Sequence, residues 1–124
     1  MAGPRQTYAL VDDLFFRARI ETTAEAAGTA VGFARSGEEL PEGIGEALVI
    51  VDLGLSGEDP VEAIRTLAER PERPTVVAFG PHRDVERFAA ARKAGADRVL
   101  ARSAFVEKLP GLLGARTSGD DGTG

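Results

Sequence analysis

Short apolar runs alternate with helical periods along this chain, and that alternation restricts the fold more than any other feature. The clearest run, Ala47–Val51, is apolar on both faces, as a strand in the middle of a parallel sheet is. Between the runs, apolar residues recur at a helical spacing, which is typical of helices with one buried face. Repeated strand-helix units predict an α/β fold in which helices cover both faces of a parallel sheet.

Five strand-helix units follow from this pattern. The predicted strands are Tyr8–Val11, Ala30–Ala34, Ala47–Val51, Thr75–Phe79 and Arg98–Ala101. The predicted helices cover residues 14–27, a short segment after Ser36, and segments that begin at Pro60, after Asp84 and near Phe105. Gly28 suits a helix C-cap, and Ser36 with Glu39 suggests a capping box. Pro110 is expected to break or restart the last helix, because proline lacks the N–H that a helix interior needs.

Composition narrows the classes of function. The 124 residues carry a net charge of −5 and no cysteine. The acidic balance argues against a nucleic-acid-binding surface, and the lack of cysteine excludes disulfides and thiolate chemistry. No apolar run approaches the ~18 residues of a membrane span, so we expect no membrane partner and a cytoplasmic location. We expect one domain over residues 7–113, with a flexible tail over 1–6 and a disordered tail over 114–124.

Three aspartates stand where apolar runs stop. Asp12 and Asp13 follow the first predicted strand, and Asp52 ends the third. In a doubly wound, flavodoxin-like sheet of strand order 2-1-3-4-5, these two strands are neighbours and their carboxyl ends share one crevice. Carboxylates that close repel one another unless a cation is present, and oxygen ligands suit Mg²⁺. The alternative is that Asp12 or Asp13 caps the first helix and Asp52 only begins a polar loop.

Three short motifs carry a resemblance to a known family. They are Val11-Asp12-Asp13 after the first strand, Val51-Asp52-Leu53 after the third and Gly95-Ala96-Asp97 before the fifth. In this order and spacing, the chain resembles the receiver domains of bacterial two-component response regulators. The resemblance covers about residues 7–113.

The resemblance implies roles for the acidic residues. Asp52 would accept a phosphoryl group from a histidine kinase or a phosphotransfer protein. Asp12, Asp13 and Asp52, with the backbone carbonyl of Gly54, would hold Mg²⁺. Positioning and neutralisation of charge are the main needs of phosphoryl transfer, and the carboxylate is the nucleophile. We expect no turnover of an external substrate.

The chain departs from the family pattern at five positions. Gly80 stands where the family has Thr or Ser, Arg102-Ser103 replaces Lys-Pro, Ser56 replaces a Pro, and Val99 replaces the switch aromatic. Arg102 keeps a positive charge that could contact phosphate, although its planar fork is not equivalent to a lysine ammonium. The hydroxyl lost at Gly80 could be replaced by Ser103, Ser56, His82 or a backbone N–H.

These observations leave alternative functions open. The first is a stand-alone receiver phosphorylated on Asp52 with a non-standard switch. The second is a phosphorylation-independent pseudo-receiver that acts as an interaction or scaffolding module, and the third is a small-ligand binder or enzyme, for which fold analogy alone is no support. Because no output domain is seen in the sequence, we expect the output to pass through a protein partner or a homodimer.

Two smaller features also have two interpretations each. Leu14 and Phe15 directly follow the acidic pair, and they either pack as a local lid or form an apolar docking patch. His82 is either a solvated loop residue or a contact for phosphate.

Overall fold

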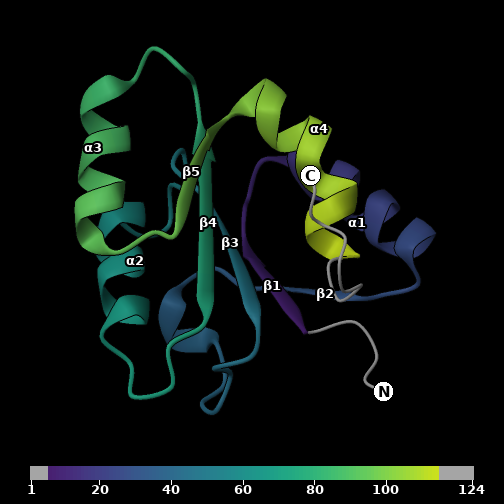
Figure 1. Cartoon of the computed structure of the whole chain (residues 1–124), viewed down its shortest axis with the longest axis horizontal. Coiled ribbons are helices and arrows are strands. Elements are labelled where there is room, and N and C mark those ends of the chain that lie inside the picture. The colour runs from purple at the N-terminus through teal and green to yellow at the C-terminus, as the bar shows by residue number, and fades with distance from the viewer. Residues whose placement is uncertain (1–5, 115–124) are drawn as a thin grey trace.

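Five parallel strands form one sheet in the order β2-β1-β3-β4-β5 in this computed structural model, which describes residues 6–114 (Figure 1). The strands are β1 (Thr7–Leu10), β2 (Val31–Phe33), β3 (Leu48–Asp52), β4 (Thr75–Gly80) and β5 (Arg98–Ala101). The predicted doubly wound, flavodoxin-like fold is therefore confirmed. Most of the two expected tails, residues 1–5 and 115–124, lies outside the described residues.

Helices cover both faces of the sheet. They are α1 (Leu14–Ala27), α2 (Pro60–Ala68), α3 (Val85–Ala94) and α4 (Arg102–Leu113), with the short 3₁₀ helix η1 (Gly37–Glu39). Figure 1 shows α2 and α3 on one side of the sheet and α1 and α4 on the other. Within the described residues, no helix is both long and apolar enough to cross a membrane.

Side chains of the central strand β3 pack in both layers of the core. Leu48 and Ile50 pack with the residues of α1 and α4, whereas Val49 and Val51 pack with those of α2 and α3. All five residues of β3 are buried, which agrees with its unbroken apolar sequence. This alternation places Asp52, two residues after Ile50, on the α1/α4 face of the sheet.

Side-chain caps fix where the helices begin and end. Asp13, Asp59 and Asp84 each accept a hydrogen bond from a backbone N–H in the first turn of α1, α2 and α3. Gly28 ends α1 in the left-handed conformation, with φ 76°. The helix boundaries that matter for the carboxyl edge of the sheet are thus encoded locally.

The segment after β2 differs from the prediction. It forms only η1, and the Ser36 side chain makes no capping hydrogen bond there. The predicted capping box is therefore wrong, because the Glu39 carboxylate accepts the N–H of Arg35 at 2.9 Å instead of that of Ser36. Pro41, Gly43 and the following glycine prevent a longer helix, so the fold has four α-helices instead of five.

The prediction for Pro110 is wrong. Helix α4 runs unbroken from Arg102 to Leu113 with Pro110 inside it. Buried side chains on both sides of the proline, Leu109 and Leu112 among them, anchor the helix to the sheet. Their burial offsets the hydrogen bond that the proline cannot make.

The Gly95-Ala96-Asp97 motif builds the amino edge of the sheet. Gly95 has φ 122°, and a Cβ at this position would lie 2.5 Å from the Cβ of Ala68, so no other residue fits. Asp97 Oδ2 accepts the N–H of Val76 at 2.8 Å and a guanidinium N–H of Arg73 at 3.1 Å. These contacts tie β5 to β4 at the edge opposite Asp52.

Candidate functional site

Asp52 is the buried acid of the carboxyl edge. It ends β3, pairs in register with Phe79 of β4, and is 2% exposed. Its Oδ1 accepts the N–H of Gly54 at 2.8 Å, and its carbonyl accepts the N–H of Leu55 at 2.9 Å. The tight turn after β3 thus directs one backbone donor at the carboxylate.

The surroundings of Asp52 favour its protonated form. Burial raises the pKa of the Asp52 carboxyl above its ordinary value, and the negative charges of Asp13 and Asp12 act in the same direction. The N–H of Gly54 and the positive charge of Arg102 act in the opposite direction and lower the pKa without cancelling the effect of burial. Asp12 and Asp13, which the topology placed near Asp52, and Arg102, which the resemblance placed there, all affect its pKa.

Asp12 forms a bridge to the loop after β3. Its Oδ2 accepts two hydrogen bonds from Ser56, from the backbone N–H at 3.2 Å and from the hydroxyl at 2.9 Å. We call this contact the Asp12–Ser56 latch. Both residues had been predicted near the site, but their pairing across 44 positions has no signal in the sequence.

Asp13 caps helix α1. Its Oδ1 accepts the N–H of Phe16 at 3.2 Å. This is the structural role left open for one of the two acids in the sequence analysis. One oxygen of Asp13 is consequently engaged in holding the first turn of the helix.

In this structure the acids are not arranged around a metal ion. Three carboxylates have the right chemistry for Mg²⁺, but no three His, Cys, Asp or Glu side chains within residues 6–114 are arranged to hold an ion. Asp12 is engaged by the latch, Asp13 caps a helix, and Asp52 is buried. Gly54 contributes its N–H to Asp52, and a role for its carbonyl as a ligand stays a prediction.

The space for a side chain at Gly80 is tight. Gly80 ends β4, and a Cβ at this position would lie 3.2 Å from the Cβ of Leu53 and 3.5 Å from the Phe88 ring. A Thr or Ser side chain would therefore require Leu53 to move. Val99 lies on β5, as predicted, and packs half-buried against the core on the α2/α3 side.

Arg102 opens helix α4 beside the site. Its guanidinium carbon lies 5.7 Å from the centroid of the Phe16 ring, a cation–π distance. In the described part of the chain its side chain has no hydrogen bond and no ion pair, so its influence on Asp52 is purely electrostatic. Ser103 and His82 are exposed and likewise make no side-chain hydrogen bond within residues 6–114.

Arg87 is a contact residue that the sequence analysis missed. Its Nη1 donates to the carbonyl of Leu53, the residue after Asp52, at 2.6 Å. Its Nε lies 3.6 Å from Oδ2 of Asp84. In the sequence it belongs to a run of alternating charges, which is typical of a solvated helix face. The distance of 34 positions to Leu53 gave no local signal.

Exposed apolar side chains lie beside the acidic residues. Leu14 is 80% exposed, Phe15 is 60% exposed, and Val85 at the start of α3 is 70% exposed. Leu14 and Phe15 therefore do not pack as a buried lid, and the docking patch stays a prediction.

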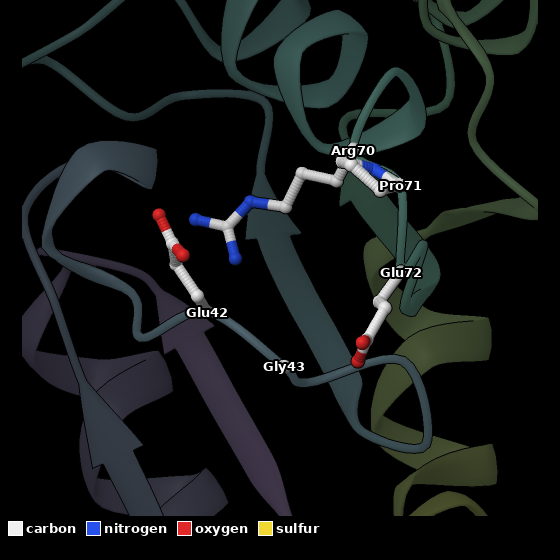
Figure 2. Close-up of a pocket in the computed structure, with 5 residues that line it drawn as sticks. All are labelled: Glu42, Gly43, Arg70, Pro71 and Glu72. Atoms are coloured by element: carbon white, nitrogen blue, oxygen red, sulfur yellow. The ribbon is translucent and has the colours of Figure 1, made fainter.

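A separate hollow lies at the opposite edge of the sheet. It has a volume of about 240 Å³ and is lined by Glu42, Gly43, Arg70, Pro71 and Glu72 (Figure 2). Figure 2 shows the Arg70 side chain extended toward Glu42, with Glu72 on the other side. The Arg70 guanidinium donates to the carbonyls of Gly37, Leu40 and Pro41. Because Arg70 is engaged with backbone in this way, the hollow is explained by anchoring of the loop around η1.

Known structures resemble this one. A response regulator receiver domain from Rhodospirillum rubrum superposes with a TM-score of 0.71 at 18% identity, over 90% of this chain and 94% of that chain. A CheY-like response regulator receiver domain protein from Methanospirillum hungatei gives 0.68 at 17% identity, over 86% and 94%. A response regulator protein from Burkholderia pseudomallei, solved with a phosphorylated aspartic acid, a calcium ion and citrate, gives 0.67 at 24% identity, over 88% and 66%. No family model and no curated protein matches the sequence.

Proposed function

Since the chain has the fold of response-regulator receiver domains, we propose that it is a receiver-like module of phosphorelay signalling whose phosphoacceptor is Asp52. The observation that carries this proposal is the position of Asp52. It is a buried carboxylate at the carboxyl edge of the central strand, beside two further acids and a cation. Ligands of doubly wound sheets bind at this edge. The response regulator of B. pseudomallei carries its phosphoryl group on an aspartic acid.

The chemistry requires only this chain and a phosphoryl donor. An oxygen of the ionised Asp52 carboxylate forms a bond to phosphorus, and the bond from phosphorus to the donor's leaving group breaks. The product is an acyl phosphate, and a phosphohistidine donor leaves as imidazole after taking up a proton. The N–H of Gly54 and the charge of Arg102 favour the ionised carboxylate that this attack needs. Arg102 would contact the phosphoryl oxygens in place of a lysine.

A divalent cation is part of this proposal. Mg²⁺ held by Asp12, Asp13, Asp52 and the Gly54 carbonyl would compete with Ser56 for Oδ2 of Asp12. The donor would be a histidine kinase or a phosphotransfer protein. We propose residues 7–113 as the functional domain, with no turnover of an external substrate and with a protein partner or a second copy as the receiver of the signal.

A phosphorylation-independent interaction module is the second candidate. The Asp12–Ser56 latch and the tight space at Gly80 favour it, because both oppose the arrangement that phosphorylation needs. The exposed side chains of Leu14, Phe15 and Val85 suit a protein partner in either case.

Intact-mass analysis after treatment with acetyl phosphate separates the two candidates. We expect the mass of one phosphoryl group to be added in the presence of Mg²⁺, less without Mg²⁺, and none in Asp52→Asn. Asp59→Asn is the control, because Asp59 is an exposed carboxylate that caps helix α2. An unchanged mass of the folded wild-type protein under all conditions would overturn the phosphoacceptor proposal and favour the interaction module.

A further inference from the structure

Leu53 connects Asp52 to helix α3 through its backbone. The carbonyl of Leu53 accepts a hydrogen bond from Nη1 of Arg87 at 2.6 Å, and its N–H donates to the carbonyl of Phe79 at 2.9 Å. Leu53 is therefore held between β4 and α3, one peptide unit after the proposed acceptor. Any displacement of the Asp52 backbone moves the oxygen that Arg87 binds.

The side chain of Leu53 makes a second connection to the same helix. It is 1% exposed and belongs to the core cluster against which Phe88 packs. It occupies the space that the glycine at position 80 leaves open, since a Cβ there would meet Leu53 at 3.2 and 3.4 Å and Phe88 at 3.5 Å. Leu53 thus packs directly beside the position where residue 80 would carry a side chain, in the same core cluster as Phe88 of α3.

Arg87 is fixed at its other end to the start of α3. Its Nε lies 3.6 Å from Oδ2 of Asp84, and Oδ1 of Asp84 accepts the backbone N–H of Arg87 at 3.4 Å as the helix cap. The guanidinium therefore links the Leu53 carbonyl to the cap of the helix. Val85, 70% exposed in the same turn, would move with it.

From these contacts we propose that Arg87 is a positioning residue that couples the state of Asp52 to the first turn of α3 through Leu53. The coupling replaces the hydroxyl that Gly80 lacks, and α3 with Val85 is the surface that reports the state of Asp52. The proposal rests on the proposed function, because phosphorylation of Asp52 is the event that the coupling would transmit.

Hydrogen exchange of the α3 backbone tests the coupling without any phosphoryl donor. Asp52→Asn serves as the perturbation of the site in four proteins: wild type, Asp52→Asn, Arg87→Met and the double variant. We expect Asp52→Asn to change the exchange rates at the start of α3 several-fold when Arg87 is present, and to leave them unchanged in the Arg87→Met background. Arg87→Lys keeps a donor and should restore part of the response.

Arg92→Met is the matched control, because Arg92 is an exposed arginine on the same helix without a contact to Leu53. It should leave the response to Asp52→Asn intact. If Arg87→Met does not fold, Arg87→Gln, whose side chain is shorter, takes its place. An equal response with and without Arg87, or no response of α3 to Asp52→Asn in the wild-type background, would overturn the coupling.

The outcomes remain distinguishable from those of the proposed function. If Asp52 takes up a phosphoryl group while α3 responds equally with and without Arg87, the phosphoacceptor proposal stands and the coupling is overturned. A chain whose α3 responds only through Arg87, but whose mass never changes with acetyl phosphate, retains the coupling and lacks the phosphoacceptor. In a chain with both properties, acetyl phosphate should alter α3 exchange in the wild type and not in Arg87→Met.

Discussion

At the amino edge of the sheet, the carboxylate of Asp97 accepts hydrogen bonds from the N–H of Val76 at 2.8 Å and from Arg73 at 3.1 Å. At the carboxyl edge, the carboxylate of Asp52 accepts one within residues 6–114, from the N–H of Gly54 at 2.8 Å. Asp52 is nevertheless the more deeply buried of the two.

The difference separates a well-compensated acid from a poorly compensated one. Asp97 has its charge matched by a cation and by a backbone donor, so it stabilises the pairing of β4 with β5. Burial removes the Asp52 carboxylate from water, and the hydrogen bond from Gly54 and the charge of Arg102 do not compensate for this loss, so its pKa is raised. Buried titratable groups with few hydrogen-bond partners are common at functional sites, because a bound ligand can supply the missing interactions.

The largest expected effect is at the amino edge, from Gly95→Ala. The backbone there has φ 122°, and the new Cβ would meet the Cβ of Ala68 at 2.5 Å. We expect a loss of about 2–5 kcal/mol in the free energy of unfolding, measured by urea denaturation. Gly111→Ala is the control, because a Cβ at Gly111 meets no atom within 4 Å, and it should be neutral or slightly stabilising. Equal stability of Gly95→Ala and wild type would contradict the role given to this motif.

A smaller loss is expected from Asp97→Ala. The substitution leaves the buried N–H of Val76 without its acceptor, which costs about 1–3 kcal/mol. Asp97→Asn retains an oxygen for this N–H and loses only the half-exposed ion pair with Arg73, worth at most about 1 kcal/mol. Thermal unfolding of both variants should therefore rank Asn above Ala. The reverse order would show that the charge matters more than the hydrogen bond.

At the carboxyl edge, we expect a substitution to raise the stability of the fold instead of lowering it. Asp52→Asn removes a poorly compensated buried charge and keeps an oxygen for the N–H of Gly54, so we expect a gain on the order of 1 kcal/mol at pH 7. The control Asp59→Asn keeps an exposed cap and should change stability by less than about 0.5 kcal/mol. A loss of stability in Asp52→Asn at pH 7 would mean that the ionised carboxylate is well solvated.

The same gain depends on pH in a direction set by the pKa of Asp52. This pKa is raised in the folded protein above its ordinary value of 3.8, so the folded state holds the proton more tightly than the unfolded chain. The contribution of Asp52 to stability is therefore fully present below pH 3.8 and is lost as the pH rises through the folded pKa. The gain in stability of Asp52→Asn over wild type should grow as the pH rises from 3.8 through the folded pKa of Asp52, and it should be constant above that pKa. Melting curves at several pH values measure this gain.

The smallest expected effect is that of Ser56→Ala. The substitution removes the hydroxyl from the Asp12–Ser56 latch and leaves the weaker bond from the Ser56 N–H at 3.2 Å. Because the contact is exposed, the loss of stability should be below about 1 kcal/mol. Isothermal titration with Mg²⁺ is the sharper measurement, and we expect tighter binding than in wild type. Ser103→Ala, which removes no side-chain contact, should bind like wild type, and equal binding by Ser56→Ala would contradict the competition between latch and cation.

Local signals in the sequence predicted most of the fold. The apolar run of β3, the caps Asp13 and Asp59, and the turn at Gly28 are all encoded by neighbours within a few residues. Pro110 was misjudged because its effect depends on how firmly Leu109 and Leu112 bind the helix to the sheet. That anchoring is a tertiary property, which a local rule for proline does not contain.

The candidate site was predicted in part. The topology placed Asp12 and Asp13 near Asp52 and the family resemblance placed Arg102 there, and all three affect the pKa of Asp52. The hydrogen bonds between residues remote in sequence, the Asp12–Ser56 latch and the contact of Arg87 with Leu53, depend on loop conformation and side-chain reach. No spacing rule describes such contacts, so they had to come from the structure.

The aromatic cluster behind Asp52 has a consequence for the direction of attack. Phe79, its register partner, stacks on Phe105 with ring centroids 4.0 Å apart and also lies 5.0 Å from Phe16. These three rings are closely packed next to Asp52, and such packing leaves no room for an incoming group or for water. If Asp52 accepts a phosphoryl group as proposed, the donor would have to approach from the side away from these rings, so the loops at the carboxyl edge of the sheet would set its direction of approach.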